Sequence, residues 1–270
     1  MPAQDHFAAF SFVDRITDLV PGRRARGTFA IPPDVEDFPA CLVAEAVGQL
    51  AAWVAMSHIG FRGRPVAALA SETRFLHDVR PGDVLDLEVD IHDVDDDAVA
   101  YRGGASVRGQ RVIELVDCLG PMLPLAEFDD PRAMAERFAL LVDGGAPPGR
   151  FRGVRRPPIV REGSTASLDV PARAPFFNDH FPRRHVFPAT LMLDAQIELA
   201  LAVARDTWAS AAPVRMTNVK VRSFTAPGTR LTLGAEVRER SGDRATFNLS
   251  AHADGKSVAT ARVVIAGVPA

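Results

Sequence analysis

The chain contains two similar halves, and this internal repeat limits its possible folds more than any other feature. Residues 38–46 read FPACLVAEA, and residues 187–195, at an offset of 149, read FPATLMLDA. A second match, at an offset of 146, relates Pro81-Gly82 to Pro227-Gly228, and the leucines that follow each pair also correspond. Two nearly constant offsets indicate a tandem duplication, so we expect two copies of one folding unit.

Each copy predicts the same order of elements: a short strand, a long helix and then a run of strands. The helices are expected at about residues 40–58 and 189–206. The first is apolar on nearly every side, which is typical of a helix that is wrapped by other elements. Leucine, valine and isoleucine alternate with acidic residues over 85–91, which predicts an antiparallel sheet with one buried face.

The two copies differ in one segment. The second copy holds about ten extra residues within 172–186, and these include His180 and His185. The first copy has acidic residues and no histidine at the corresponding place. Any histidine-dependent chemistry in this region is therefore expected from the second copy.

We predict three parts: residues 1–126 as the first repeat, 127–160 as a linker, and 161–270 as the second repeat. The linker carries one helical signal over 131–142, with Asp130 as its N-cap and Pro131 at its first position.

Composition excludes several classes of protein. A net charge of −3 with 24% charged residues argues against a nucleic-acid partner. Two cysteines far apart in the chain exclude a cysteine-based zinc site, and we expect no metal or other cofactor. No apolar run is long enough for a membrane span, and residues 1–10 lack a secretory pattern, so a cytoplasmic protein without a membrane partner is expected.

The motifs in both copies resemble one family. His180-Phe181-Pro182 is followed, fourteen residues after the histidine, by Asp194-Ala195, while the first copy carries Glu45-Ala46 and Gln49. This combination is similar to that of the β-hydroxyacyl-acyl-carrier-protein dehydratases, which have the hotdog fold. The resemblance implies an α+β double hotdog, in which two long helices are each wrapped by a curved antiparallel sheet about a pseudo-twofold axis.

The resemblance also implies a hydro-lyase that dehydrates 3-hydroxyacyl thioesters, carried on phosphopantetheine or coenzyme A, in fatty-acid or polyketide-type synthesis. In that family one hotdog supplies the histidine and its partner supplies the acid. We therefore expect a single competent site with His180 and Glu45 as catalytic residues, and Asp194 as a vestigial or auxiliary acid. Substrate-binding positions would be Phe181, Pro188, Ala189, Ala40 and Gln49.

The chain departs from the family pattern at four glycines, which are replaced by Ala40, Ala189, Asp179 and Arg183. Two alternatives stay open for this reason. One is a thioesterase in which Glu45 activates water, and the other is a non-catalytic acyl-binding or partner-recognition module. The structural alternative for Glu45 is a contact with solvent or with an arginine.

The expected partners follow from the same resemblance. The acyl thioester is the substrate, and Arg183 and Arg184, beside His180, are candidates for docking an acidic acyl carrier protein. Whether two chains pair again as a homodimer stays open.

Overall fold

The computed structural model describes residues 9–147 and 149–269, and its elements follow the order expected for two repeats. The expectation about a secretory leader falls largely on residues 1–8, which lie outside the described residues. The first repeat comprises β1 (Arg15–Val20), β2 (Arg24–Ala30), α1 (Ala40–His58), β3 (Gly63–Pro65), β4 (Leu69–Phe75), β5 (Val84–Val94), β6 (Ala98–Val107) and β7 (Gln110–Pro124). The linker region holds η1 (Leu125–Glu127) and α2 (Pro131–Asp143). Next come β8 (Ile159–Glu162), β9 (Thr165–Asp169), η2 (Pro175–Asn178), α3 (Ala189–Arg205), β10 (Trp208–Val221), β11 (Arg230–Ser241), β12 (Arg244–Ala253) and β13 (Lys256–Pro269).

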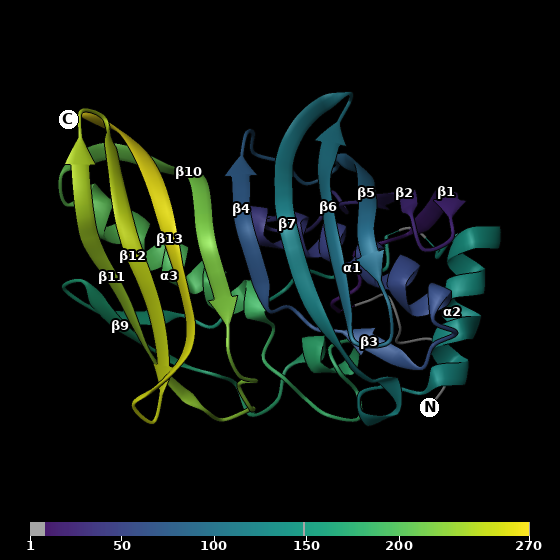
Figure 1. Cartoon of the computed structure of the whole chain (residues 1–270). Coiled ribbons are helices and arrows are strands. Elements are labelled where there is room, and N and C mark those ends of the chain that lie inside the picture. Colours follow the sequence, from purple (N-terminus) through teal and green to yellow (C-terminus); the bar gives the residue numbers. More distant parts are fainter. Residues whose placement is uncertain (1–8, 148, 270) are drawn as a thin grey trace.

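One antiparallel sheet runs through both repeats (Figure 1). Its strand order is β1-β2-β5-β6-β7-β4-β10-β13-β12-β11-β9-β8, and β3 pairs with β7. The repeats meet where β4 pairs with β10, from Arg74 opposite Arg215 to Leu69 opposite Lys220. Because β4 and the second half of β10 are equivalent in the two copies, this pairing lies at the pseudo-twofold axis.

The two long helices lie side by side against the inner face of the sheet (Figure 1). Helix α1 packs on β2, β5 and β6, and α3 packs on β10, β11 and β12. The prediction of a double hotdog is thus confirmed, with α1 as expected and α3 ending one residue earlier. Helix α1 is long and apolar enough to cross a membrane, but most of it is buried inside this fold, which accounts for its composition.

The predicted linker helix is present as α2, and tight hairpins connect the long strands. Asp95–Asp97 and Ser241–Asp243 lie at hairpin tips, between β5 and β6 and between β11 and β12. The side chain of Asp130 caps α2, because its Oδ1 accepts hydrogen bonds from the backbone N–H groups of Arg132 at 3.0 Å and Ala133 at 3.1 Å. Strand β8 begins at Ile159, inside the segment predicted as linker.

The linker packs into the first repeat as well as connecting the two. Phe151 is buried against Phe12, Phe29 and Phe38, with ring centroids 5.3–6.0 Å apart. Edge-to-face packing of this kind is favourable for aromatic rings at these distances. The route of the linker is therefore fixed by the core of the first repeat.

A glycine in β6 allows α1 to approach the sheet closely, and its replacement should be costly. A Cβ atom at Gly103 would lie 2.6 Å from the carbonyl oxygen of Glu88 and 2.7 Å from Val47 Cγ1. We expect Gly103→Ala to lower the free energy of unfolding by about 1–3 kcal/mol, measured by urea denaturation. Gly144→Ala is the control, because a Cβ there meets nothing within 4 Å and its φ is −125°. Equal effects of the two substitutions would contradict this account.

Candidate active site between the repeats

A cavity of about 190 Å³ lies between the two repeats and is lined by both. Most of its lining is apolar, including Ala52, Val99 and Leu115 from the first repeat and Met192, Met216 and Val219 from the second. Glu45 and His180, the two predicted catalytic residues, both line it. An acid from one copy and an imidazole from the other therefore share one apolar cavity.

Small residues on α1 form one wall of this cavity. Ala44, Gly48 and Ala52 are spaced by four, which puts them on one helix face, and all three line the cavity. A Cβ atom at Gly48 would lie 3.3 Å from the hydroxyl of Tyr101, another lining residue. The absence of large side chains on this face leaves space between the helix and the sheet.

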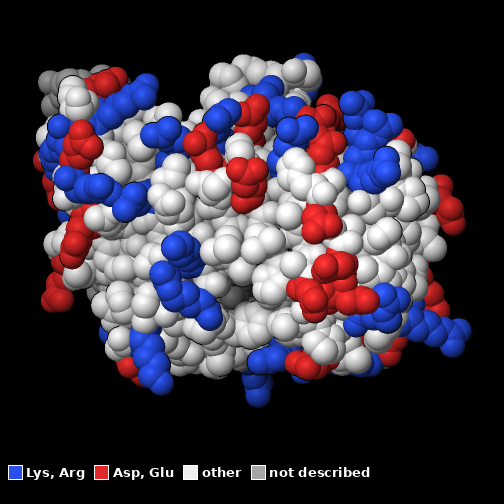
Figure 2. Space-filling view, viewed as in Figure 1, with Lys and Arg blue, Asp and Glu red and all other residues white. Residues whose placement is uncertain are grey.

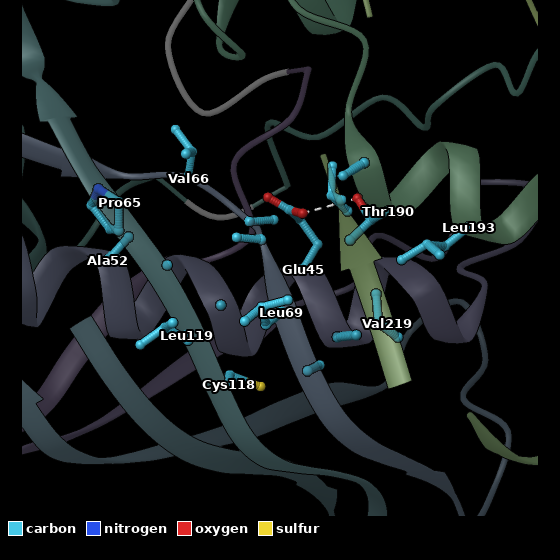
Figure 3. Close-up of a pocket in the computed structure, with 18 of the residues that line it drawn as sticks. Glu45, Ala52, Pro65, Val66, Leu69, Cys118, Leu119, Thr190, Leu193 and Val219 are labelled. Carbon is cyan, nitrogen blue, oxygen red and sulfur yellow. Dashed lines mark hydrogen bonds between the residues drawn. The ribbon is translucent and has the colours of Figure 1, made fainter. Parts of the chain in front are cut away.

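Glu45 is held by hydrogen bonds from both repeats. Its Oε2 accepts from the Thr190 hydroxyl at 2.9 Å, and its Oε1 accepts from Gln49 Nε2 at 3.0 Å. Figure 3 shows Glu45 on α1 and Thr190 at the start of α3 reaching toward one another. Burial raises the pKa of Glu45 above its usual range, although the hydrogen bonds from Gln49 and Thr190 oppose this effect. The shift favours the protonated carboxyl relative to an ordinary glutamate, which is the direction that a proton donor needs.

His180 follows the short helix η2 and presents one ring nitrogen for chemistry. Its Nδ1 lies 3.2 Å from the carbonyl oxygen of Val186. Because a carbonyl only accepts, Nδ1 carries the proton of the neutral ring and Nε2 carries the lone pair. Burial, with a smaller effect of the Arg64 charge, lowers the pKa of His180 to about 3. The imidazole is therefore neutral near pH 7 and leaves Nε2 unprotonated, while the same low pKa makes it a weaker base than an exposed histidine.

Arg64, in β3, is a lining residue that the sequence prediction missed. Its guanidinium carbon lies 4.3 Å from the centroid of the Phe181 ring, and the Phe181 and His180 rings are stacked with centroids 4.0 Å apart. Burial lowers the pKa of Arg64 to about 10, so the group stays charged. The only signal in the sequence is one arginine between Gly63 and a run of apolar residues, which gives no indication that the side chain faces a cavity.

The other predicted positions fall into two groups. Phe181, Ala189 and Gln49 line the same cavity as Glu45 and His180. Pro188 is the N-cap residue of α3. Ala40 lines a separate cavity of about 320 Å³ with Asp37, His77 and Asp78. That cavity corresponds by the repeat offsets to the part of the first cavity around Ala189 and Ser223 to Thr225.

Asp194, the counterpart of Glu45, forms an ion pair with Arg156 of the linker. Its Oδ2 accepts from Arg156 Nη1 at 3.0 Å, and the other Nη of Arg156 pairs with Asp37. The thiol of Cys41 also hydrogen-bonds Asp194, which is equivalent to the bond from Thr190 to Glu45, because Cys41 and Thr190 correspond at the offset of 149. Two equivalent positions thus hold acids. Asp194 forms an ion pair with Arg156, whereas Glu45 lines the cavity, which also contains Arg64.

Comparison with known proteins gives a consistent family. Residues 160–262 match the family model described as ApeI-like, ApeI dehydratase. The chain is 31% identical to the 3-hydroxyacyl-[acyl-carrier-protein] dehydratase FabZ of Clostridium acetobutylicum over 113 residues, covering 38% of this chain and 80% of the relative. It is 34% identical to FabZ of Bacillus subtilis over 128 residues, covering 43% of this chain and 91% of that protein.

Solved structures match over nearly the whole chain. A putative oleoyl thioesterase from Lactobacillus plantarum aligns with a TM-score of 0.62 at 11% identity, covering 92% of this chain and 97% of that one. A MaoC-like dehydratase aligns with a TM-score of 0.55 at 13% identity, covering 92% and 98%. The dehydratase domain of PpsC from Mycobacterium tuberculosis, in complex with C12:1-CoA, aligns with a TM-score of 0.52 at 16% identity, covering 96% and 100%. At these identities the similarity establishes the fold alone.

The low pKa of His180 can be measured without any substrate. We expect ¹⁵N NMR of labelled histidine to show a neutral, Nδ1-protonated ring from pH 8 down to about pH 4, because protonation would place a charge in the apolar cavity near Arg64. Arg64→Met should raise this pKa, since it removes a nearby positive charge. A ring that titrates near pH 6.5 would contradict the burial described here.

Proposed function

Because the chain belongs to the FabZ family of 3-hydroxyacyl-[acyl-carrier-protein] dehydratases, we propose that it dehydrates 3-hydroxyacyl thioesters reversibly to trans-2-enoyl thioesters. The observation that carries this proposal is that an imidazole and a carboxyl from different repeats line one apolar cavity, where burial lowers the pKa of His180 and raises the pKa of Glu45. We further propose that the reaction serves fatty-acid or polyketide-type synthesis in the cytoplasm.

The proposed mechanism begins at the carbon next to the thioester. Nε2 of His180 takes the α-proton, and negative charge develops on the thioester oxygen. The amides of Ala189 and Thr190 precede the first internal hydrogen bond of α3, which runs from Leu191 N to Pro188 O. Amides of this kind, at the positive end of a helix, are suited to stabilising that oxygen.

Loss of the β-hydroxyl completes the reaction. Glu45 donates its proton to the hydroxyl, which leaves as water while the double bond forms. Burial raises the pKa of Glu45, and this direction supports the role because it makes the protonated carboxyl more accessible than in an exposed glutamate. Thr190 and Gln49 fix the orientation of the carboxyl, so that its proton can be delivered in one direction.

A hydration assay with crotonyl-CoA, combined with detection of free CoA, tests the proposal. We expect the wild type to hydrate the double bond, and His180→Ala and Glu45→Gln to lower kcat/KM by about 10²–10⁴-fold, because each removes a proton-transfer group. Asp194→Gln is the matched control at the equivalent position of the other helix, and its kcat/KM should stay near that of the wild type.

The same assay distinguishes the two alternative functions, a thioesterase and an acyl-binding module, and it also tests the assignment of the acid. Release of free CoA that persists in His180→Ala would indicate a thioesterase in which Glu45 activates water. Binding of crotonyl-CoA without hydration or hydrolysis would indicate an acyl-binding module. Equal losses in Glu45→Gln and Asp194→Gln would contradict the assignment of the acid.

An acyl carrier protein is the proposed donor of the substrate. Arg183 and Arg184, in the loop that follows His180, are about half exposed and pair with Asp130 and Glu127. Elsewhere, on the face shown in Figure 2, positive and negative side chains are intermixed around a mainly uncharged centre. A docking surface would therefore depend on local arginines, because the chain has no net positive charge.

Charge reversal tests this docking surface. We expect Arg183→Glu with Arg184→Glu to raise KM for a carrier-bound substrate about tenfold or more at low ionic strength, because acidic carriers would be repelled. KM for the same acyl group on coenzyme A should change much less. Equal changes for both substrates, or none, would exclude these arginines as a carrier-docking surface.

A further inference from the structure

A four-residue segment of the first repeat, Ala9–Phe12, connects the histidine of one repeat to the acid of the other, and we call it the N-terminal strap. On one side, the ring of Phe10 packs edge-on against the imidazole of His180, with centroids 5.3 Å apart. On the other side, the strap bonds to Gln49, whose Nε2 donates to Phe10 O at 3.0 Å and whose Oε1 accepts from Phe12 N at 2.8 Å. Gln49 is also the hydrogen-bond donor to Glu45.

The strap is attached to the second repeat by the residue that precedes the histidine. Oδ2 of Asp179 accepts hydrogen bonds from Ala9 N at 3.0 Å and from Phe10 N at 2.8 Å. Asp179 is only 8% exposed, and Ala9 and Phe10, whose backbone N–H groups it binds, are also buried. The bonds bridge positions 169 and 170 residues apart in the chain, so they join the two repeats directly.

A carboxyl at this position departs from the family pattern. The family pattern has glycine before the histidine, and glycine could accept nothing from the strap through a side chain. A buried carboxylate that lost its donors would be strongly unfavourable, so the pair of N–H donors and the carboxylate must stay together. The strap is thus held at Ala9 and Phe10 by Asp179 and at Phe10 and Phe12 by Gln49.

We propose that Asp179 is a positioning residue, which fixes the N-terminal strap and through it the relative orientation of His180 and Glu45. This inference rests on the proposed dehydratase function, because it assigns Asp179 a role in turnover. Asp179 itself does not line the cavity between the repeats. Its hydrogen bonds would act through the Phe10 ring and the Gln49 amide, and its negative charge also acts directly on His180, where it raises the pKa of the imidazole. Substrate binding, which depends on the cavity lining, should be little affected.

The test compares Asp179→Gly, which restores the family residue, with Asp179→Asn, which keeps an oxygen acceptor. In the crotonyl-CoA hydration assay we expect Asp179→Gly to lower kcat about 10–100-fold with KM changed less than about threefold, because small errors in the position of catalytic groups are costly. Asp179→Asn should recover most of this loss. In ¹⁵N NMR the His180 signal should shift or broaden in Asp179→Gly, and the amides of Ala9 and Phe10 should exchange faster.

Asp95→Gly is the matched control. Oδ1 of Asp95 likewise accepts hydrogen bonds from two consecutive backbone amides, Asp97 N at 2.8 Å and Ala98 N at 2.9 Å, at a hairpin tip outside the cavity lining. Its kcat and the His180 signal should match those of the wild type, whatever its stability.

Other outcomes overturn the inference. An unchanged kcat in Asp179→Gly, or a rise in KM alone, would show that Asp179 has no positioning role. If Asp179→Gly does not fold, Asp179→Asn decides: its kcat should fall by less than about 10-fold relative to the wild type, with faster exchange at Ala9 and Phe10. Wild-type values for both would overturn the proposal. A wild type that does not hydrate crotonyl-CoA would instead overturn the proposed function, while the exchange rates would still report whether Asp179 holds the strap.

Discussion

The pairing of β4 with β10 is the constraint on which the rest of the structure depends. It joins the sheets of the two repeats into one and places α1 beside α3 on its inner face. With that geometry, the side chain at the second position of α3, Thr190, can reach the acid of α1. The equivalent position of α1, Cys41, reaches the acid of α3. The repeat therefore generates two equivalent acid positions from one symmetric contact.

Glu45 and Asp194 have different surroundings because the two copies differ in the segments next to them. The second repeat contributes a loop with His180, which lines the same cavity as Glu45, whereas the first has a shorter connection without a histidine. The linker sends Arg156 to Asp194 and Asp37, which compensates a buried charge that would otherwise be unfavourable. Glu45 thus lines the cavity between the repeats, whereas Asp194 is held in an ion pair with Arg156.

The helices and strands and their order along the chain could be predicted from the sequence. The period of the apolar residues predicted the long helices, and the alternation over 85–91 predicted β5, because these signals are local in the chain. The sequence was also sufficient to select His180 and Glu45 as candidates, through the family motifs. The roles of Arg64, Arg156 and Asp179 could not be predicted in the same way. Each contacts or faces residues of another segment, and a single charged residue in a sequence does not indicate which distant segment it will meet.

The stripe of Ala44, Gly48 and Ala52 has a consequence for how such an enzyme could diversify. These three residues lie on the same helix as Glu45 and line the same cavity. The hydrogen bonds that orient the Glu45 carboxyl come instead from Gln49 and Thr190. Exchanging one of the three small residues for a bulkier residue would narrow the passage available to a hydrocarbon tail while leaving the proton-transfer groups in place. Under the proposed function, acyl-chain preference and proton transfer would depend on different positions of one helix, so that each could change in evolution without the other.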